Sequence, residues 1–133
     1  MAEELIIRIS NDSDIVKARQ KGREVAAEVG FPLTDLALVA TAISELSRNI
    51  LRYARQGEIV IRRAENAGRH GILVIARDRG PGIADVERAL EVGFSTSGGL
   101  GLGLPGVRRL MDEFEIVSRR GSGTTVTIAK WKP

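Results

Sequence analysis

The chain has 133 residues, a formal net charge of +3 and 43% hydrophobic residues, which suits one globular domain with one core over residues 1–133. It has no cysteine and one histidine, so disulfides, thiolate catalysis and histidine metal clusters are excluded. Basic residues are scattered and aromatic residues make up only 4%, which disfavours a nucleic-acid partner. No segment resembles a signal peptide or a membrane span, so we expect a cytoplasmic protein without a membrane partner.

The first third of the chain predicts one strand and two helices. Apolar residues alternate along 5–9, as in a strand. The first helix has candidate N-caps at 11–13 and a glycine C-cap at Gly30. The second helix opens at Thr34 or Asp35 and is amphipathic. Its apolar stripe, the most regular pattern in the chain, consists of Leu36, Val39, Ile43, Leu46, Ile50 and Tyr53.

The rest of the chain predicts mainly strands. Residues 58–62 resemble a half-buried strand, Asn66–His70 a hairpin turn, and 72–76 a central strand that is apolar on both faces. The elements expected after it are a short helix at 85–91, a loop at 93–103, a helix with Pro105 in its first turn, and strands at 114–118 and 124–131. This order predicts the fold class α/β: a two-layer α/β sandwich with helices on one face of a mixed sheet.

A carboxylate and an amide form the first candidate site. Glu45 and Asn49 are four residues apart on the second helix, so they share one side of it beside the apolar stripe. The alternative interpretation is a solvated polar pair with Arg48 and Arg52 as helix neighbours.

Two glycine-rich segments are the other candidates. D-R-G-P-G at 78–82 follows the central strand, where Asp78 could accept a hydrogen bond from a ligand amine; the alternative is an ordinary turn. G-G-L-G-L-G at 98–103 precedes a helix, and free N–H groups there could bind phosphate. It is no P-loop, because no G-K-[ST] follows, and no dinucleotide fingerprint, because it does not follow a strand.

Taken in this order, the motifs resemble the ATP-binding (Bergerat) fold of the GHKL superfamily: gyrase, Hsp90, histidine kinases and MutL. Residues 45–49 resemble its N box, 78–83 its first glycine box, 93–103 its lid with the second glycine box, and 123–125 its closing box. Three runs are similar to the small bacterial serine/threonine kinases of partner-switching modules, the anti-sigma factor kinase family with its stressosome switch kinases: T-A-I-S-E-L-S-R-N-I, G-F-S-T-S-G-G-L-G and L-P-G-V-R-R-L-M-D-E-F.

The resemblance implies ATP and Mg²⁺ as ligands and a role for each matching residue. Glu45 would be the general base and Asn49 the magnesium ligand. Asp78 would accept from the adenine amine, Gly82 would lie near the ring, and Thr125 would complete the adenine pocket. The full nucleotide-binding set implied is Asn49, Asp78, Gly80, Gly82, Ile83, Gly98, Gly99, Leu100, Gly101, Leu102, Gly103 and Thr125.

The resemblance also implies the partners. They are STAS-domain antagonist or scaffold proteins as substrates, and a PP2C-type phosphatase that the released kinase activates. One alternative is an anti-sigma factor kinase that sequesters a sigma factor; another is a detached histidine-kinase domain. The lid at 95–103 is short and uncharged, which favours the switch kinase and leaves the stabilisation of the γ-phosphate open. The partner surface and the oligomeric state stay open too, with the region around Arg19 and Arg23 as one candidate surface.

Overall fold

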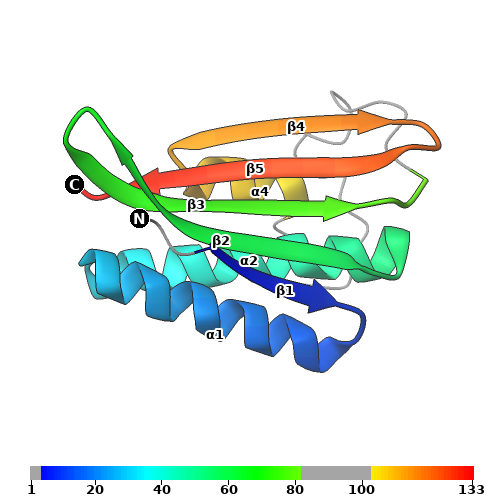
Figure 1. Cartoon of the computed structure of the whole chain (residues 1–133), viewed down its shortest axis with the longest axis horizontal. Helices are drawn as coiled ribbons and strands as arrows, with labels where there is room; N and C mark the ends of the chain where they lie inside the picture. Colours follow the sequence, from blue (N-terminus) through cyan, green and yellow to red (C-terminus); the bar gives the residue numbers. More distant parts are fainter. Residues whose placement is uncertain (1–3, 82–102) are drawn as a thin grey trace.

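The computed structural model describes residues 4–81 and 103–133, which form five strands and three helices (Figure 1). The elements in chain order are β1 Glu4–Ile9, α1 Asp12–Val29, α2 Leu33–Ala54, β2 Gly57–Asn66, β3 Arg69–Asp78, α4 Gly103–Leu110, β4 Glu113–Arg119 and β5 Gly123–Trp131. The strands form one sheet in the order β1-β2-β3-β5-β4, and the helices lie on one side of it. The predicted two-layer α/β sandwich is confirmed.

The sheet differs from the prediction in strand direction. All four neighbouring pairs are antiparallel, so the described sheet is antiparallel and not mixed. The reason is visible in the chain order. Two helices, α1 and α2, separate β1 from β2 and pack against each other. An even number of crossings brings the chain back at the end where β1 finished, so β2 runs in the opposite direction.

Helix α1 has the caps that its sequence predicts. The side chain of Asn11 accepts from the backbone N–H of Asp14 at 3.1 Å, and the Asp14 carboxylate accepts from the backbone N–H of Asn11 at 3.2 Å. This reciprocal pair is a capping box. Gly30 closes the helix in the left-handed conformation, with φ at 103°.

Helix α2 buries the predicted stripe except at its last residue. It begins at Leu33, one or two residues before the expected start, and Pro32 at its N-cap makes no side-chain hydrogen bond. Leu36 through Ile50 of the stripe are buried, whereas Tyr53 is 55% exposed. Tyr53 was expected on the apolar stripe, and that expectation is wrong. The neighbouring Ala54 takes the packing contact at this end of the helix, against Gly80.

The centre of the sheet is built as predicted. β2 and β3 form a hairpin whose two turn residues, Ala67 and Gly68, both have positive φ. β3 lies between β2 and β5 and buries Ile72, Val74 and Ala76 on the helix-facing side. The expected short helix at 85–91 and most of the loop at 93–103 lie outside the described residues. Within the described ranges, no helix is long and apolar enough to span a membrane.

Candidate active site

Three elements bring candidate residues to one end of the molecule. β3 ends at Asp78, β5 begins at Gly123, and α2 ends at Ala54. In the register of the sheet, Asp78 lies between Gly57 on one side and Thr124 on the other. Figure 1 shows the end of β3, the start of β5 and the end of α2 at the same edge of the fold. The D-R-G-P-G segment therefore starts where the helix layer and the sheet meet.

The turn after β3 is held against the last turn of α2. The backbone N–H of Gly80 donates to Oδ1 of Asp78 at 2.8 Å. A Cβ placed on Gly80 would lie 2.6 Å from the Cβ of Ala54, so only glycine allows this approach. Asp78 is half-buried, and its Oδ2 has no hydrogen bond to any described residue. One oxygen of the carboxylate thus fixes the turn, and the other can accept from a ligand.

Of the two threonines in the predicted closing box, Thr124 and not Thr125 lies beside Asp78 in the sheet. Thr124 is the direct partner of Asp78, and Thr125 is the partner of Arg77. Successive side chains of a strand point to opposite faces. Thr124 therefore shares the helix-facing side with Asp78, and Thr125 lies on the outer side with Arg77. The sequence predicts Thr125 beside Asp78 in the adenine pocket. In the structure Thr125 lies beside Arg77 instead.

The signal for Thr124 was present in the sequence. Val126 and Ile128 are buried on the helix-facing side, and counting back by two from them reaches Thr124. Gly123, just before Thr124, allows the backbone of β5 to approach Asp78 closely. It has φ at 95°, and a Cβ there would collide with the carbonyl oxygen of Asp78. The backbone at the start of β5 therefore lies in close contact with the backbone at the end of β3.

Glu45 is a buried carboxylate with one charged partner. Its side chain is 2% exposed, and Nη1 of Arg48 lies 2.8 Å from its Oε1. The alternative interpretation of a solvated polar pair therefore fails for Glu45. Asn49, one turn further on, is half-buried and has no hydrogen-bond partner among the described residues. A buried acid beside an amide that has no partner among the described residues is unusual outside functional sites.

Glu45, Asn49 and Ala54 are spaced along the axis of α2. Ala54 touches the Asp78 turn, Asn49 lies five residues before it, and Glu45 nine. At 1.5 Å per residue these steps correspond to about 7.5 Å and about 13.5 Å along the helix axis. The order along the helix axis is therefore the turn after β3, the amide and the buried carboxylate, and Ala54 lies about 140° around the helix from Asn49 and about 180° from Glu45.

Gly103 is the other glycine-box residue that the structure describes. It is the first residue of α4, is buried, and has φ at 53°. α4 packs against α2, so Gly103 belongs to the helix layer that carries Glu45 and Asn49. The remaining predicted site residues lie outside the described ranges: Gly82, Ile83, Gly98, Gly99, Leu100, Gly101 and Leu102.

The donor set fits a nucleotide-bound magnesium ion better than a metal held by protein alone. In residues 4–81 and 103–133 there is no group of three or more His, Cys, Asp or Glu side chains that could hold a metal. Asn49 offers one amide oxygen that has no partner in residues 4–81 and 103–133. Mg²⁺ at nucleotide sites usually takes one or two protein ligands and completes its shell with phosphates and water. One amide ligand is compatible with that mode.

The comparisons with known proteins agree with this geometry. Residues 10–130 match the family model of the histidine kinase-like ATPase domain, and the chain belongs to that family. Within it, the chain is 53% identical over 131 residues to the serine/threonine-protein kinase RsbT of Bacillus subtilis (strain 168), with 98% of both chains covered. The predicted GHKL membership and the predicted enzyme class, a protein serine/threonine kinase, are confirmed by these two findings.

More distant relatives extend the same picture. The chain is 34% identical over 112 residues to the anti-sigma F factor of Caldanaerobacter subterraneus subsp. tengcongensis, covering 80% of this chain and 77% of the relative. A crystal structure of the RsbU and RsbW domains of a Mycobacterium tuberculosis protein matches with a TM-score of 0.64 at 24% identity. The match covers 100% of this chain but 33% of that one, and it establishes the fold alone. Membership of an ATPase family implies that ATP is used.

Proposed function

We propose that the protein is an ATP-dependent serine/threonine kinase of a bacterial partner-switching stress module. Its substrates would be STAS-domain antagonist or scaffold proteins in the cytoplasm, and its release from them would activate a PP2C-type phosphatase. The observation that carries the proposal is the order of residues along the axis of α2: a buried Glu45 held by Arg48, then Asn49, then the contact of Ala54 with the Asp78 turn. The similarity to RsbT supports the same class of reaction.

The nucleotide would lie beside α2 with its adenine at the Asp78 end. Oδ2 of Asp78, which has no partner in the described part of the chain, would accept from the exocyclic amine, and Thr124 on the adjacent strand would complete the pocket. Gly80 allows the turn to lie close to α2, and the adenine ring would lie beside this turn. Gly82 and Ile83, and the glycine box at 98–103, take the roles that the resemblance gives them.

Asn49 would hold Mg²⁺ through its side-chain oxygen. Mg²⁺, when bound, neutralises charge on the β- and γ-phosphates. Along the helix axis Asn49 lies between Ala54 and Glu45. This order supports the role, because in ATP the α- and β-phosphates lie between the adenine and the γ-phosphorus that is attacked.

Glu45 would act as the general base. The hydroxyl oxygen of a substrate Ser or Thr forms the new bond to the γ-phosphorus, the bond from that phosphorus to the β–γ bridging oxygen breaks, and ADP leaves. The hydroxyl proton goes to the Glu45 carboxylate. Phosphoryl transfer depends mainly on position and charge, and Arg48 fixes the position of this carboxylate at 2.8 Å.

A second candidate function is an anti-sigma factor that binds and sequesters a sigma factor. The 34% identity to an anti-sigma F factor favours it. One experiment separates the two. Purified protein is incubated with γ-labelled ATP and either a STAS-domain protein or a sigma factor encoded nearby. We expect acid-stable phosphate on the STAS protein and no stable complex with the sigma factor. A sigma complex without transfer, or acid-labile phosphate on the acceptor, would contradict the proposal.

A further inference from the structure

The end of the sheet that carries Asp78 changes from apolar to polar within one row of side chains. The register of the strands puts five residues, from β1 across to β4, in the last row on the helix-facing side: Ile9, Gly57, Asp78, Thr124 and Ser118. The row before it contains only apolar residues: Ile7, Ile59, Ala76, Val126 and Ile116. In the row of the candidate adenine acceptor, the neighbour on the β2 side is therefore a glycine.

Gly57 has no room for a side chain. A Cβ placed there would lie 2.6 Å from the carbonyl oxygen of Arg77, 3.1 Å from the Cβ of Asp78 and 2.8 Å from Cγ2 of Ile50 on α2. Residues directly opposite each other on antiparallel strands normally have their Cβ atoms about 4.5–5.5 Å apart, so two side chains would not fit here. Gly57 is not among the glycines with positive φ, and its role is therefore steric and not conformational.

Two glycines that border Asp78 receive the same face of α2. Ile50 packs over Gly57, and Ala54 packs against Gly80. Ile50 and Ala54 are four positions apart, so they lie on one face of the helix. Gly57 is the cross-strand partner of Asp78, and the N–H of Gly80 donates to its Oδ1 at 2.8 Å. The helix is therefore packed closely on both sides of this carboxylate.

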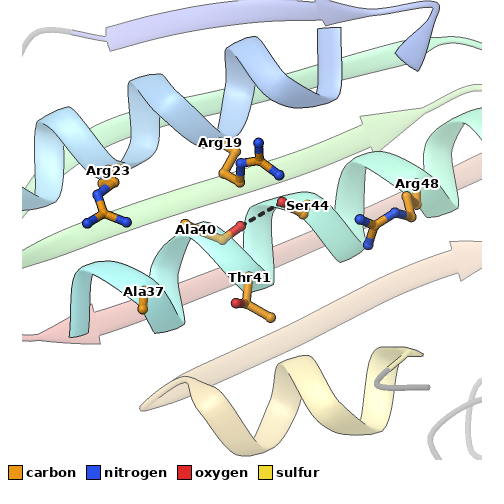
Figure 2. Close-up of a pocket in the computed structure, with 7 residues that line it drawn as sticks. All are labelled: Arg19, Arg23, Ala37, Ala40, Thr41, Ser44 and Arg48. Carbon is orange, nitrogen blue, oxygen red and sulfur yellow. Dashed lines mark hydrogen bonds between the residues drawn. The ribbon is translucent and has the colours of Figure 1, made fainter. Parts of the chain in front are cut away.

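Helix α2 has little freedom to move away from a side chain added at Gly57. It packs against α1 and α4, and Figure 2 shows it running between these two helices with strands of the sheet behind it. Ile50 is 2% exposed and belongs to the hydrophobic core. Asp78, in contrast, is half-buried, and among the described residues its carboxylate accepts one hydrogen bond. A Cβ at position 57 would therefore displace Asp78 more readily than the helix.

We propose that Gly57 is a positioning residue for Asp78: because it places no side chain beside that carboxylate, Asp78 can stay where it binds the exocyclic amine of adenine. The inference rests on the proposed role of Asp78 as the adenine acceptor. A hydrogen bond weakens steeply when its distance and direction are lost, so a displaced Asp78 would lose the amine, whereas the contacts to the triphosphate would remain. Gly57 thereby contributes to specificity for adenine through Asp78.

The test compares two nucleotides that differ only at this amine. ATP and purine riboside triphosphate, which has hydrogen in place of the exocyclic amine, are titrated by calorimetry with Mg²⁺ present into the unaltered chain and into Gly57→Ala. We expect the unaltered chain to bind ATP about tenfold or more tightly than the analogue. In Gly57→Ala, the Kd for ATP should rise about fivefold and the Kd for the analogue less than about twofold. A general loss of stability would leave the ratio of the two constants unchanged.

Gly71→Ala is the matched control. Gly71 lies on β3, has no positive φ, and a Cβ there would collide with the carbonyl oxygen of Lys130 on β5. It is seven residues before Asp78, or about 23 Å along the strand. Gly71→Ala should lose stability in urea unfolding, as Gly57→Ala does, and should keep the ratio of the two dissociation constants. An equal fall of the ratio in both variants would overturn the proposal.

A double variant keeps the proposal testable if Gly57→Ala alone fails to fold. Ile50→Leu removes Cγ2, the helix atom that would lie 2.8 Å from the added Cβ, so Gly57→Ala/Ile50→Leu relieves the core and leaves the clash with β3. The loss of discrimination should persist in this variant. Discrimination equal to that of the unaltered chain in the double variant would overturn the proposal, because it would assign the effect to the packing of α2.

The same titrations separate this inference from the proposed function. If the unaltered chain binds both nucleotides equally, Asp78 is not the adenine acceptor, and the inference fails with that role. If the unaltered chain discriminates and transfers phosphate to a STAS-domain protein, but Gly57→Ala discriminates equally well, the kinase function stands and the positioning role of Gly57 fails. If Gly57→Ala loses discrimination and the unaltered chain transfers no phosphate, the positioning role stands and the kinase function fails.

Discussion

Asp78 and Thr124 are direct cross-strand partners on the helix-facing side of the sheet, and Thr125 is turned to the other side with Arg77. The carboxylate that would bind the adenine therefore has one hydroxyl beside it, and the identity of that threonine is set by strand register. The hydroxyl of Thr124 also lies 2.7 Å from that of Ser118 on β4, which holds it in place.

The two threonines should differ in their effect on nucleotide affinity. Thr124→Ala should raise the Kd for ATP about tenfold, because a hydrogen-bonding group beside the adenine is lost. Thr125→Ala is the matched control and should change Kd by less than about twofold. Titration with a fluorescent ATP analogue measures both, and a larger effect from Thr125→Ala would contradict the register argument.

Asp78→Asn should weaken ATP binding while keeping the fold. An asparagine can still accept the Gly80 N–H with its amide oxygen, but its amide nitrogen cannot accept from the adenine amine. We expect Kd to rise about tenfold or more, since a charge-assisted hydrogen bond is lost. Asp12→Asn, on the exposed start of α1, serves as the control. An unchanged Kd in Asp78→Asn would remove Asp78 from the adenine site.

Glu45→Gln should separate nucleotide binding from transfer. The amide oxygen can still accept from Arg48, so the packing is retained, but the side chain can no longer take a proton. The rate of phosphate transfer to the STAS protein should fall about a hundredfold or more, and ATP should still bind. The more disruptive Glu45→Ala should show the same division. Transfer at the normal rate by either variant would exclude Glu45 as the base.

Gly123→Ala tests how much the close contact between β5 and the Asp78 backbone contributes to the free energy of unfolding. Gly121 is the control, because it also has positive φ, at 81°, but a Cβ there meets nothing within 4 Å. Gly121→Ala should cost about 1 kcal/mol for its backbone conformation alone. Gly123→Ala should cost about 2 kcal/mol more, since its Cβ collides with the Asp78 backbone. Urea unfolding of the two variants measures the difference, and equal costs would show that the contact is readily relieved.

The cap of α1 should make stability depend on pH in the acid range. The backbone N–H of Ser10, and then its hydroxyl and the N–H of Asn11, hold the pKa of Asp14 below its usual value of 3.8. A lowered folded-state pKa means that the stabilisation is present above 3.8 and is lost as the pH falls through the folded value. Asp14→Asn should therefore show a flatter loss of stability on acidification than the unaltered chain. Parallel curves from thermal unfolding at a series of acid pH values would contradict this role.

Local patterns predicted much of the fold because they are read from neighbouring residues. The cap of α1, the stripe of α2 and the central position of β3 all follow from spacing within one element. The direction of the strands was predicted less well. It depends on how many helices separate two strands, and the sequence interpretation did not apply that count to β1 and β2. Tyr53 fits the helical spacing but is exposed, because at this end of α2 it is Ala54 that packs against the turn after β3.

The site was predicted by type more reliably than by residue. Glu45 and Asn49 lie on the predicted helix and Asp78 at the end of the predicted strand, while their roles stay predictions. Thr125 was chosen from the motif without counting the alternation of β5 from the buried Val126. The motif does not predict the ion pair between Arg48 and Glu45, because the pair depends on side-chain conformation. The spacing of three residues allows this contact on a helix.

Helix α2 is one uninterrupted element from Leu33 to Ala54, and this continuity fixes distances. Under the proposed roles, the contact for the adenine end, the magnesium ligand and the base are all carried by consecutive hydrogen-bonded turns. Their separations cannot change without breaking the helix. The distance along the axis between the Asp78 turn and Glu45 would therefore be the same whichever nucleotide is bound.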